Sequence, residues 1–138
     1  MKLTIYCDGG ARGNPGPGAS AFVVEKDGKV IYKNSKYLGN ATNNVAEYNA
    51  VILALGWLFK NDGIGYSVTS VQIMLDSELV AKQLSGFYKV KNQNLKKLFA
   101  TAKDLEQKTK MKIAYSAVPR TKNKLADFLV NENLDSNL

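Results

Sequence analysis

Residues 3–38 read LTIYCDGGARGNPGPGASAFVVEKDGKVIYKNSKYL, and they set the expected fold. Three segments in this stretch are rich in β-forming side chains. They are residues 3–8, 19–26 and 29–38. A loop with five glycines and two prolines joins the first two segments, and the turn Asp27-Gly28 joins the second and third. Asp-Gly is a frequent hairpin turn, so we expect three consecutive antiparallel strands.

The rest of the chain alternates between helical and strand patterns. From Asn44 to Phe59 the apolar residues recur every three to four positions, with Thr42 or Asn43 as a candidate N-cap. The later predicted elements are a strand at 71–76, a short helix at 77–84, a helix at 93–108, a strand at 111–118 and a helix at 121–134. The packing face of the last helix is expected to consist of Leu125, Phe128 and Leu129. A strand reached through a helix tends to run parallel to one already in the sheet. The sequence therefore predicts an α/β fold with a mixed five-stranded sheet covered on both faces.

Length and composition narrow the possible functions. With 138 residues, we expect a single domain spanning 1–138. No apolar run approaches the ~18 residues of a membrane span, and the N-terminus has no signal-peptide core, so we expect a cytoplasmic protein without membrane contact. The net charge of +7 favours a polyanionic partner or a solubilising surface. The chain has no histidine, which excludes His-based acid-base catalysis and His metal ligands.

Carboxylates occur at positions where a cation site is expected. Asp8 and Asp76 each end a predicted strand, and ligands gather at the carboxyl ends of strands in open α/β sheets. Glu47 lies in line with apolar residues on its predicted helix, where a carboxylate is costly unless it is paired or binds a metal. Asp127, on the last helix, fits a solvated charge as well as a functional one. Turn chemistry would also explain each strand-end aspartate taken alone.

Together these four side chains suggest an all-oxygen metal site. Carboxylates without His or Cys ligands suit a hard cation such as Mg²⁺ or Mn²⁺. Two such ions can hold the attacking and leaving oxygens in a phosphoryl displacement. The basic surplus and the acidic cluster then fit one hypothesis, in which lysines bind a nucleic-acid backbone and the carboxylates hold the metal that cuts it.

Four motifs carry a resemblance to a known family. They are YCDGGARGNPGPG (6–18), ATNNVAEYNAVILAL (41–55), LDSELVAKQLSGFYKVKN (75–92) and VPRTKNKLADFLVNENL (118–134). In their order and spacing the chain resembles ribonuclease H type 1, in particular its compact archaeal and bacterial forms, from Met1 to about residue 134. The resemblance implies the RNase H-like fold and endonucleolytic hydrolysis of the RNA strand of an RNA/DNA hybrid, leaving 5'-phosphate and 3'-hydroxyl ends.

The resemblance also implies roles for individual residues. Asp8, Glu47 and Asp76 match the three central metal-binding carboxylates, and Asp127 matches the fourth, which helps to position a second ion and the attacking water. The residues expected to contact the hybrid are Gly13, Asn14, Thr42, Asn43, Asn44, Arg120 and Asn123. Among them, Asn14, Asn43 and Asn44 would contact ribose 2'-hydroxyls across the minor groove, which distinguishes RNA from DNA. Thr42 would hold a phosphate of the DNA strand.

The chain departs from the family pattern at three places. Many relatives carry a histidine before the last helix, near the position of Ala117, and Arg120 is a candidate replacement that cannot act as a base. Glu78 stands where many relatives have a glutamine that reaches a base edge. The long basic segment with several tryptophans found in some relatives is absent, although lysines such as Lys89 and Lys91 remain.

Two other hypotheses stay open on the sequence alone. The same fold and metals would serve cleavage of double-stranded RNA or of RNA–DNA junctions. A non-catalytic nucleic-acid-binding module on this fold is the alternative of another class, but it would have no reason to retain an acidic cluster that repels phosphate. We expect a monomer, because nothing in the chain signals a dimer interface.

Overall fold

The computed structural model describes residues 2–61 and 67–138. Within them, the strands are β1 (Lys2–Ala11), β2 (Gly16–Lys26), β3 (Lys29–Ala41), β4 (Ser70–Leu75) and β5 (Lys112–Ala117). The helices are α1 (Asn43–Lys60), α3 (Glu78–Leu84), α4 (Gln93–Thr109) and α5 (Lys124–Ser136), with a short 3-10 turn, η1 (Arg120–Lys122), before α5. The predicted order of elements is therefore confirmed.

The five strands that the described residues form make one mixed sheet in the order β3-β2-β1-β4-β5. β2 is antiparallel to both β1 and β3, whereas β4 is parallel to β1 and to β5. In the parallel pair, Cys7 stands opposite Leu75, so Asp8 and Asp76 lie side by side. Asp76 directly follows β4, whereas β1 continues past the predicted end at Asp8 to Ala11, because residues 8–11 still pair with β2. The mixed sheet and the parallel fourth strand were both predicted.

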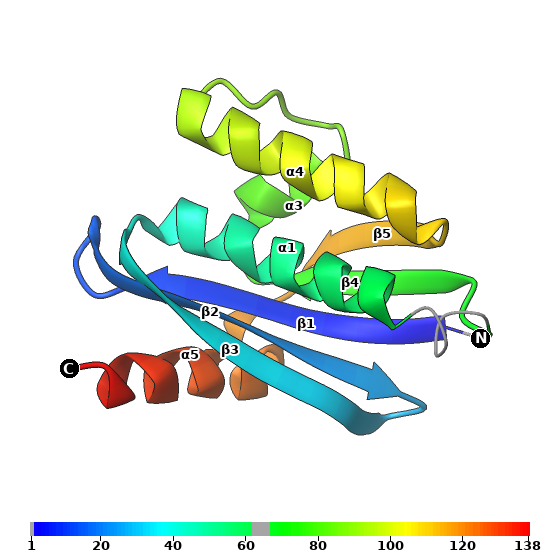
Figure 1. The fold of residues 1–138 in the computed structure, drawn as a ribbon, viewed down its shortest axis with the longest axis horizontal. Helices are drawn as coiled ribbons and strands as arrows, with labels where there is room; N and C mark the ends of the chain where they lie inside the picture. The colour runs from blue at the N-terminus through cyan, green and yellow to red at the C-terminus, as the bar shows by residue number, and fades with distance from the viewer. Residues whose placement is uncertain (1, 62–66) are drawn as a thin grey trace.

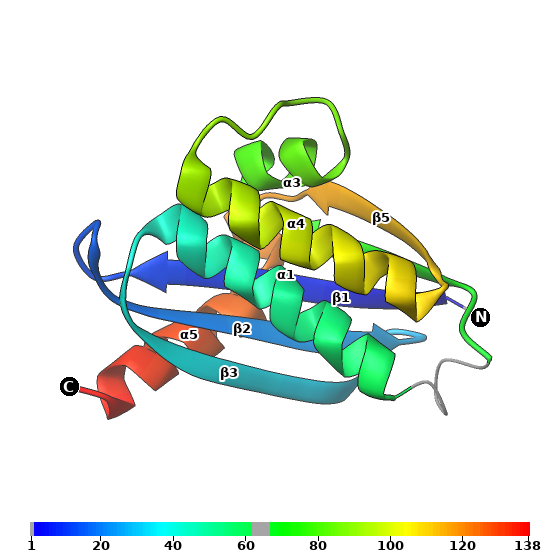
Figure 2. The same ribbon diagram turned by 45° about the horizontal axis from the view of Figure 1, so that its top comes forward.

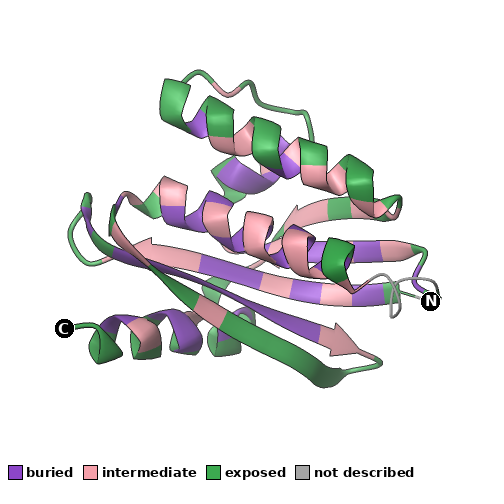
Figure 3. Ribbon diagram, viewed as in Figure 1, coloured by how far each residue is buried: buried purple, intermediate pink, exposed green. Residues whose placement is uncertain are grey.

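Helices cover both faces of the sheet. Figure 1 shows α1, α3 and α4 on one face and α5 on the other, and Figure 2 shows α4 lying along α1 above the strands. The main core lies between α1 and the sheet, where Ile5, Tyr48 and Ile73 are fully buried. A smaller core lies under α5 and includes Val23 and Val130. Figure 3 shows that β3, at the edge of the sheet, is largely exposed.

Side-chain caps fix the starts of two helices near the end of β1. The Thr42 side chain accepts a hydrogen bond from the Val45 N–H at 3.2 Å, so Thr42 is the N-cap of α1. The Ser77 side chain accepts from the Val80 N–H at 3.2 Å and caps α3 in the same way. Both caps hold helices that start beside the strand ends, where the acidic residues lie.

The last helix differs from the prediction in its start. Residues 120–122 form η1, and α5 begins only at Lys124. Its buried face consists of Ala126, Leu129, Val130 and Leu134. Of the three residues expected to form its packing face, Leu129 is buried, whereas Leu125 and Phe128 are 37% and 58% exposed.

No helix among residues 2–61 and 67–138 has the length and apolar character needed to cross a membrane.

Candidate active site

Three carboxylates meet where β1, α1 and β4 converge. Asp8 lies in β1, Glu47 lies on the second turn of α1, and Asp76 follows β4. One carboxylate oxygen from each of them lies within 4.8 Å of the others. Asp8 and Glu47 are buried and Asp76 is half-buried. All three line a polar cleft of about 510 Å³ that also includes Asp127.

Close packing of α1 against β1 places Glu47 at this site. The Gly9 N–H donates a hydrogen bond to Glu47 Oε1 at 3.1 Å. A side chain at Gly9 would lie 2.2 Å from the backbone carbonyl of Ala46, so only glycine allows this approach. The hydroxyl of Ser20, in β2, donates to the same carbonyl at 2.6 Å. The helix is therefore fixed to two strands within one residue of Glu47.

Burial and mutual repulsion change the protonation of the cluster. Burial, followed by the negative charge of Asp76, raises the pKa of Asp8 from 3.8 to about 7. Burial, followed by the charge of Asp8, raises the pKa of Glu47 well above its usual value. Among the described residues, Glu47 Oε2 and Asp76 Oδ2 are buried without a hydrogen-bond partner. Buried oxygens that lack a donor and repel one another are suited to a divalent cation.

The raised pKa gives a testable dependence of stability on pH. The folded, metal-free protein holds a proton on Asp8 that the unfolded chain releases near pH 4, so the free energy of unfolding should fall as the pH rises from about 4 to about 7. Asp8→Asn removes the carboxyl group whose deprotonation lowers the free energy of unfolding. In chelator at pH 8 we expect the variant to be more stable than the wild type by up to about 4 kcal/mol, and no gain near pH 4. Urea unfolding at the two pH values measures the difference; equal gains at both would contradict it.

Asp127 joins the cleft from the other side of the sheet. It lies in the first turn of α5 and is half-buried. Its carboxylate is not part of the three-carboxylate cluster in the described residues, although it lines the same cleft. The structure therefore brings together all four acidic residues singled out in the sequence, three of them closely and Asp127 at the rim.

The expected substrate contacts border this cleft. Asn43 and Asn44 line it at the start of α1. Asn14 Oδ1 accepts from the Asn43 N–H at 3.0 Å, and Asn43 Oδ1 accepts from the Ala11 N–H at 2.9 Å. A neighbouring groove is lined in part by Asn14, Thr42, Asn43 and Asn44. Gly13 lies exposed beside Asn14, between β1 and β2, and its φ of 87° favours glycine. These polar groups thus form one connected rim.

Arg120 approaches the cluster from η1. Its Nε lies 3.8 Å from Asp76 Oδ2, which is an ion-pair distance but too long for a hydrogen bond. The side chain is largely exposed, so it has room to reach a bound molecule in the cleft. Glu78, the other departure from the family pattern, pairs with Lys82 at 2.7 Å on the exposed side of α3.

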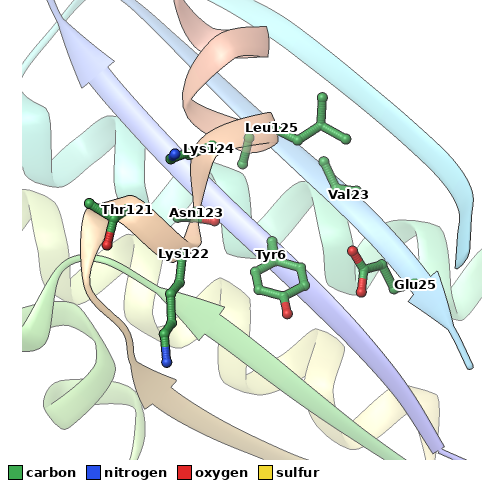
Figure 4. A pocket seen from close by; sticks show the side chains of 9 residues that line it. Tyr6, Val23, Glu25, Thr121, Lys122, Asn123, Lys124 and Leu125 are labelled. Carbon is green, nitrogen blue, oxygen red and sulfur yellow. The ribbon is translucent and has the colours of Figure 1, made fainter. Parts of the chain in front are cut away.

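Asn123 does not fit the expected substrate contact. It is 1% exposed, and its Nδ2 donates to the Cys7 carbonyl at 2.8 Å. Figure 4 shows it beside Tyr6 and Lys122 at a smaller cavity of about 220 Å³, which is separate from the carboxylate cleft. Asn123 therefore joins the start of α5 to β1 directly before Asp8, so the polar residue that the motif offered as a ligand contact lies inside the protein.

Two residues that the sequence reasoning missed also line the cleft, Arg12 and Asn131. Asn131 follows Asp127 by four positions and so lies on the same side of α5, which is a signal that was available. Arg12 stands within the glycine-rich loop. The two residues are far apart in the chain, and local patterns do not reveal that they meet.

Comparisons with known proteins agree with this geometry. The RNase H family model matches residues 1–135. The bifunctional protein Rv2228c of Mycobacterium tuberculosis is 41% identical over 138 residues, which cover 99% of this chain and 36% of that protein. Ribonuclease HI of Halobacterium salinarum is 37% identical over 135 residues, covering 97% of this chain and 65% of the relative. The chain thus spans about a third of the length of the mycobacterial protein.

A solved structure gives the same result for the fold. The crystal structure of LC11-RNase H1 in complex with an RNA/DNA hybrid superimposes with a TM-score of 0.91 at 40% sequence identity, and the match covers 98% of both chains. The expected RNase H-like fold is therefore confirmed. Because the family model extends over nearly the whole chain and the motif carboxylates meet in one cleft, this chain belongs to the RNase H family.

Proposed function

We propose that this chain is a divalent-metal-dependent endonuclease that hydrolyses the RNA strand of RNA/DNA hybrids, leaving 5'-phosphate and 3'-hydroxyl ends. The observation that carries the proposal is the cluster of Asp8, Glu47 and Asp76, whose carboxylate oxygens approach within 4.8 Å and in which, among the described residues, Glu47 Oε2 and Asp76 Oδ2 are buried without a hydrogen-bond partner. Support for the substrate comes from the similar LC11-RNase H1, whose solved structure is a complex with an RNA/DNA hybrid.

Each acidic residue has a proposed role. Asp8, Glu47 and Asp76 would hold Mg²⁺, with Mn²⁺ as a possible substitute, and Asp127 would help to hold a second ion at the rim of the cleft. When bound, such ions lower the pKa of a water and offset charge on the scissile phosphate. The protein's own contribution is to fix four oxygen ligands on rigid elements and to keep the buried ones out of bulk water.

Substrate selection is assigned to the polar rim. Asn43 and Asn44 line the carboxylate cleft and Asn14 lines the neighbouring groove, where their side chains would contact ribose 2'-hydroxyls, while Gly13 lets the loop backbone come close. Thr42 would contact a phosphate of the DNA strand. Lysines such as Lys89 and Lys91 would add sequence-independent attraction to the backbone. All four carboxylates come from one chain, which supports activity as a monomer.

Arg120 is proposed to stabilise charge during turnover, because it reaches the cleft beside Asp76 but stays protonated. We expect Arg120→Ala to lower kcat about tenfold, with less than about a twofold change in KM for the hybrid. Steady-state cleavage assays measure both constants. An unchanged kcat would reject the role, and Lys110→Ala, which removes a positive charge at the far end of α4, is the control.

Cleavage of an end-labelled RNA strand tests the proposed function. The strand is annealed to DNA, to RNA, or within a duplex that has a single RNA–DNA junction, and each substrate is incubated with Mg²⁺, Mn²⁺ or chelator. We expect internal cuts in the hybrid with metal and none with chelator, and the other two substrates define the substrate range. Tight binding of the hybrid without cleavage under either metal would contradict the proposal and indicate a nucleic-acid-binding module.

A further inference from the structure

We propose that Arg12 is a positioning residue, which acts through Asn131 to hold the Asp127 carboxylate in the orientation that binds metal. The inference rests on the proposed function and adds to it a connection between the glycine-rich loop and the fourth carboxylate. Neither Arg12 nor Asn131 needs to touch the substrate for this role.

The connection begins on α5. Asp127, Asn131 and Asp135 are spaced four residues apart, so they form one stripe along the helix. Asn131 Nδ2 lies 3.0 Å from the Asp127 carbonyl and 3.4 Å from Asp127 Oδ1, and it donates to both. The Asn131 amide therefore limits the directions in which the Asp127 carboxylate turns.

Arg12 reaches the same stripe from the loop between β1 and β2. Its Nη2 forms an ion pair of 2.7 Å with Asp135 Oδ1 and longer contacts of 3.4 and 3.5 Å with the Asn131 carbonyl and Oδ1. The loop holds Arg12 in place, because the Arg12 N–H donates to the Pro17 carbonyl at 2.8 Å. A side chain at Gly16 would lie 2.1 Å from the Arg12 carbonyl, so the loop is closely packed at this point.

The two ends of the Asn131 side-chain amide differ in polarity, which explains why a cation is needed beside its oxygen. With Oδ1 toward the Arg12 guanidinium and Nδ2 toward Asp127, both ends of the amide meet an opposite charge. The flipped amide would place its NH₂ group against a cation and its oxygen against a carboxylate, and both contacts would be repulsive. Arg12 therefore selects the amide orientation in which Asn131 donates to Asp127.

Asp127 needs such support more than the other carboxylates do. Glu47 is fixed by burial and by the Gly9 N–H, whereas Asp127 sits half-buried at the rim of the cleft. Groups that orient a metal ligand affect metal affinity or activity about 10- to 100-fold when they are removed. The Arg12–Asp135 pair itself has side-chain exposures of 38% and 65%, so it should add little to stability. A functional loss without a stability loss is thus the expected signature.

The test compares Arg12→Ala, Asn131→Ala, their double variant and Arg12→Lys with the wild type. Calorimetric titration of the metal-free proteins with Mn²⁺ gives metal affinity without any substrate, and hybrid cleavage gives kcat and KM.

Both alanine variants should bind the second Mn²⁺ ion, the one that Asp127 is proposed to help hold, about tenfold more weakly than the wild type. They should also lower kcat about tenfold, with KM unchanged within about twofold. The double variant should lose no more than the larger single loss, because both act through one contact. Arg12→Lys should recover part of each loss.

Asp104→Ala is the matched control, since it removes another exposed ion pair, with Lys108 at 2.9 Å, and should leave Mn²⁺ binding and cleavage unchanged. Wild-type values for Asn131→Ala in both assays would overturn the inference. A rise in KM with an unchanged kcat for Arg12→Ala would also overturn it and would indicate direct contact with a phosphate. If the wild type cleaved no hybrid, the proposed function would fail, while the Mn²⁺ titration would still decide whether Arg12 positions Asp127.

Discussion

Replacing Asp76 by asparagine is expected to lower cleavage of the hybrid RNA strand by at least about a thousandfold. Asp76 supplies one of the three clustered carboxylates, and one of its oxygens is buried without a hydrogen-bond partner among the described residues. Asparagine keeps the shape but loses the charge, so the affinity for a divalent cation falls. A loss of about 4 kcal/mol in transition-state stabilisation corresponds to this factor in rate. Single-turnover cleavage of an end-labelled hybrid in Mg²⁺ measures it.

Two further measurements separate a catalytic loss from a binding loss. The affinity for the hybrid, measured by fluorescence anisotropy, should be unchanged or higher for Asp76→Asn, because a negative charge facing the phosphates has been removed. Asp104→Asn makes the same chemical change on the exposed surface of α4 and should keep full activity. If Asp76→Asn retained more than a tenth of the wild-type rate, Asp76 would not be an essential metal ligand.

Gly9→Ala is expected to lower the free energy of unfolding by more than about 3 kcal/mol and to abolish cleavage. The added methyl group would lie 2.2 Å from the Ala46 carbonyl carbon and oxygen, and backbone on both sides leaves no flexible neighbour to move aside. Relief of the overlap requires α1 to move away from β1, which carries Glu47 away from Asp8. Urea unfolding and hybrid cleavage measure the two effects.

Gly56→Ala is the control for this change because Gly56 also lies in the packed part of the chain, inside α1. A side chain at Gly56 would meet nothing within 4 Å, so alanine there should be neutral or stabilise the helix by up to about 1 kcal/mol. Similar effects of the two substitutions would show that the close approach at Gly9 does not determine the position of α1.

The acidic centre was predictable because each of its residues breaks a local pattern. Asp8 and Asp76 each follow an apolar strand segment, which turn chemistry would also explain, whereas Glu47 interrupts the apolar side of a helix and so conflicts with a purely structural role. The sequence predicted that the fourth strand runs parallel to one already in the sheet, and its pairing with β1 places Asp76 beside Asp8. Local patterns suggested a cation site, and the family resemblance assigned the four carboxylates to it.

The start and packing face of α5 were not predictable in the same way. The sequence suggested a face of Leu125, Phe128 and Leu129, but of these only Leu129 is buried, because the helix turns small Ala126, together with Val130, toward the sheet. A shift of one position rotates a helix face by about 100°. Asn123 failed for a related reason, since sequence does not say whether a polar side chain faces a ligand or a buried carbonyl. The contact of Arg12 with α5 depends on tertiary structure alone.

The pairing of β1 with β4 also determines when the acidic centre forms during folding. β1, β2, β3 and α1 are consecutive in the chain and bring Asp8 and Glu47 together through contacts between neighbouring elements, whereas almost half the chain separates β1 from β4, and α5 with Asp127 comes later still. Contacts between distant segments form slowly, because the intervening chain loses entropy when the loop closes. We therefore expect Asp76 and Asp127 to join after Asp8 and Glu47 have met, so that tight divalent-cation binding reports completed folding.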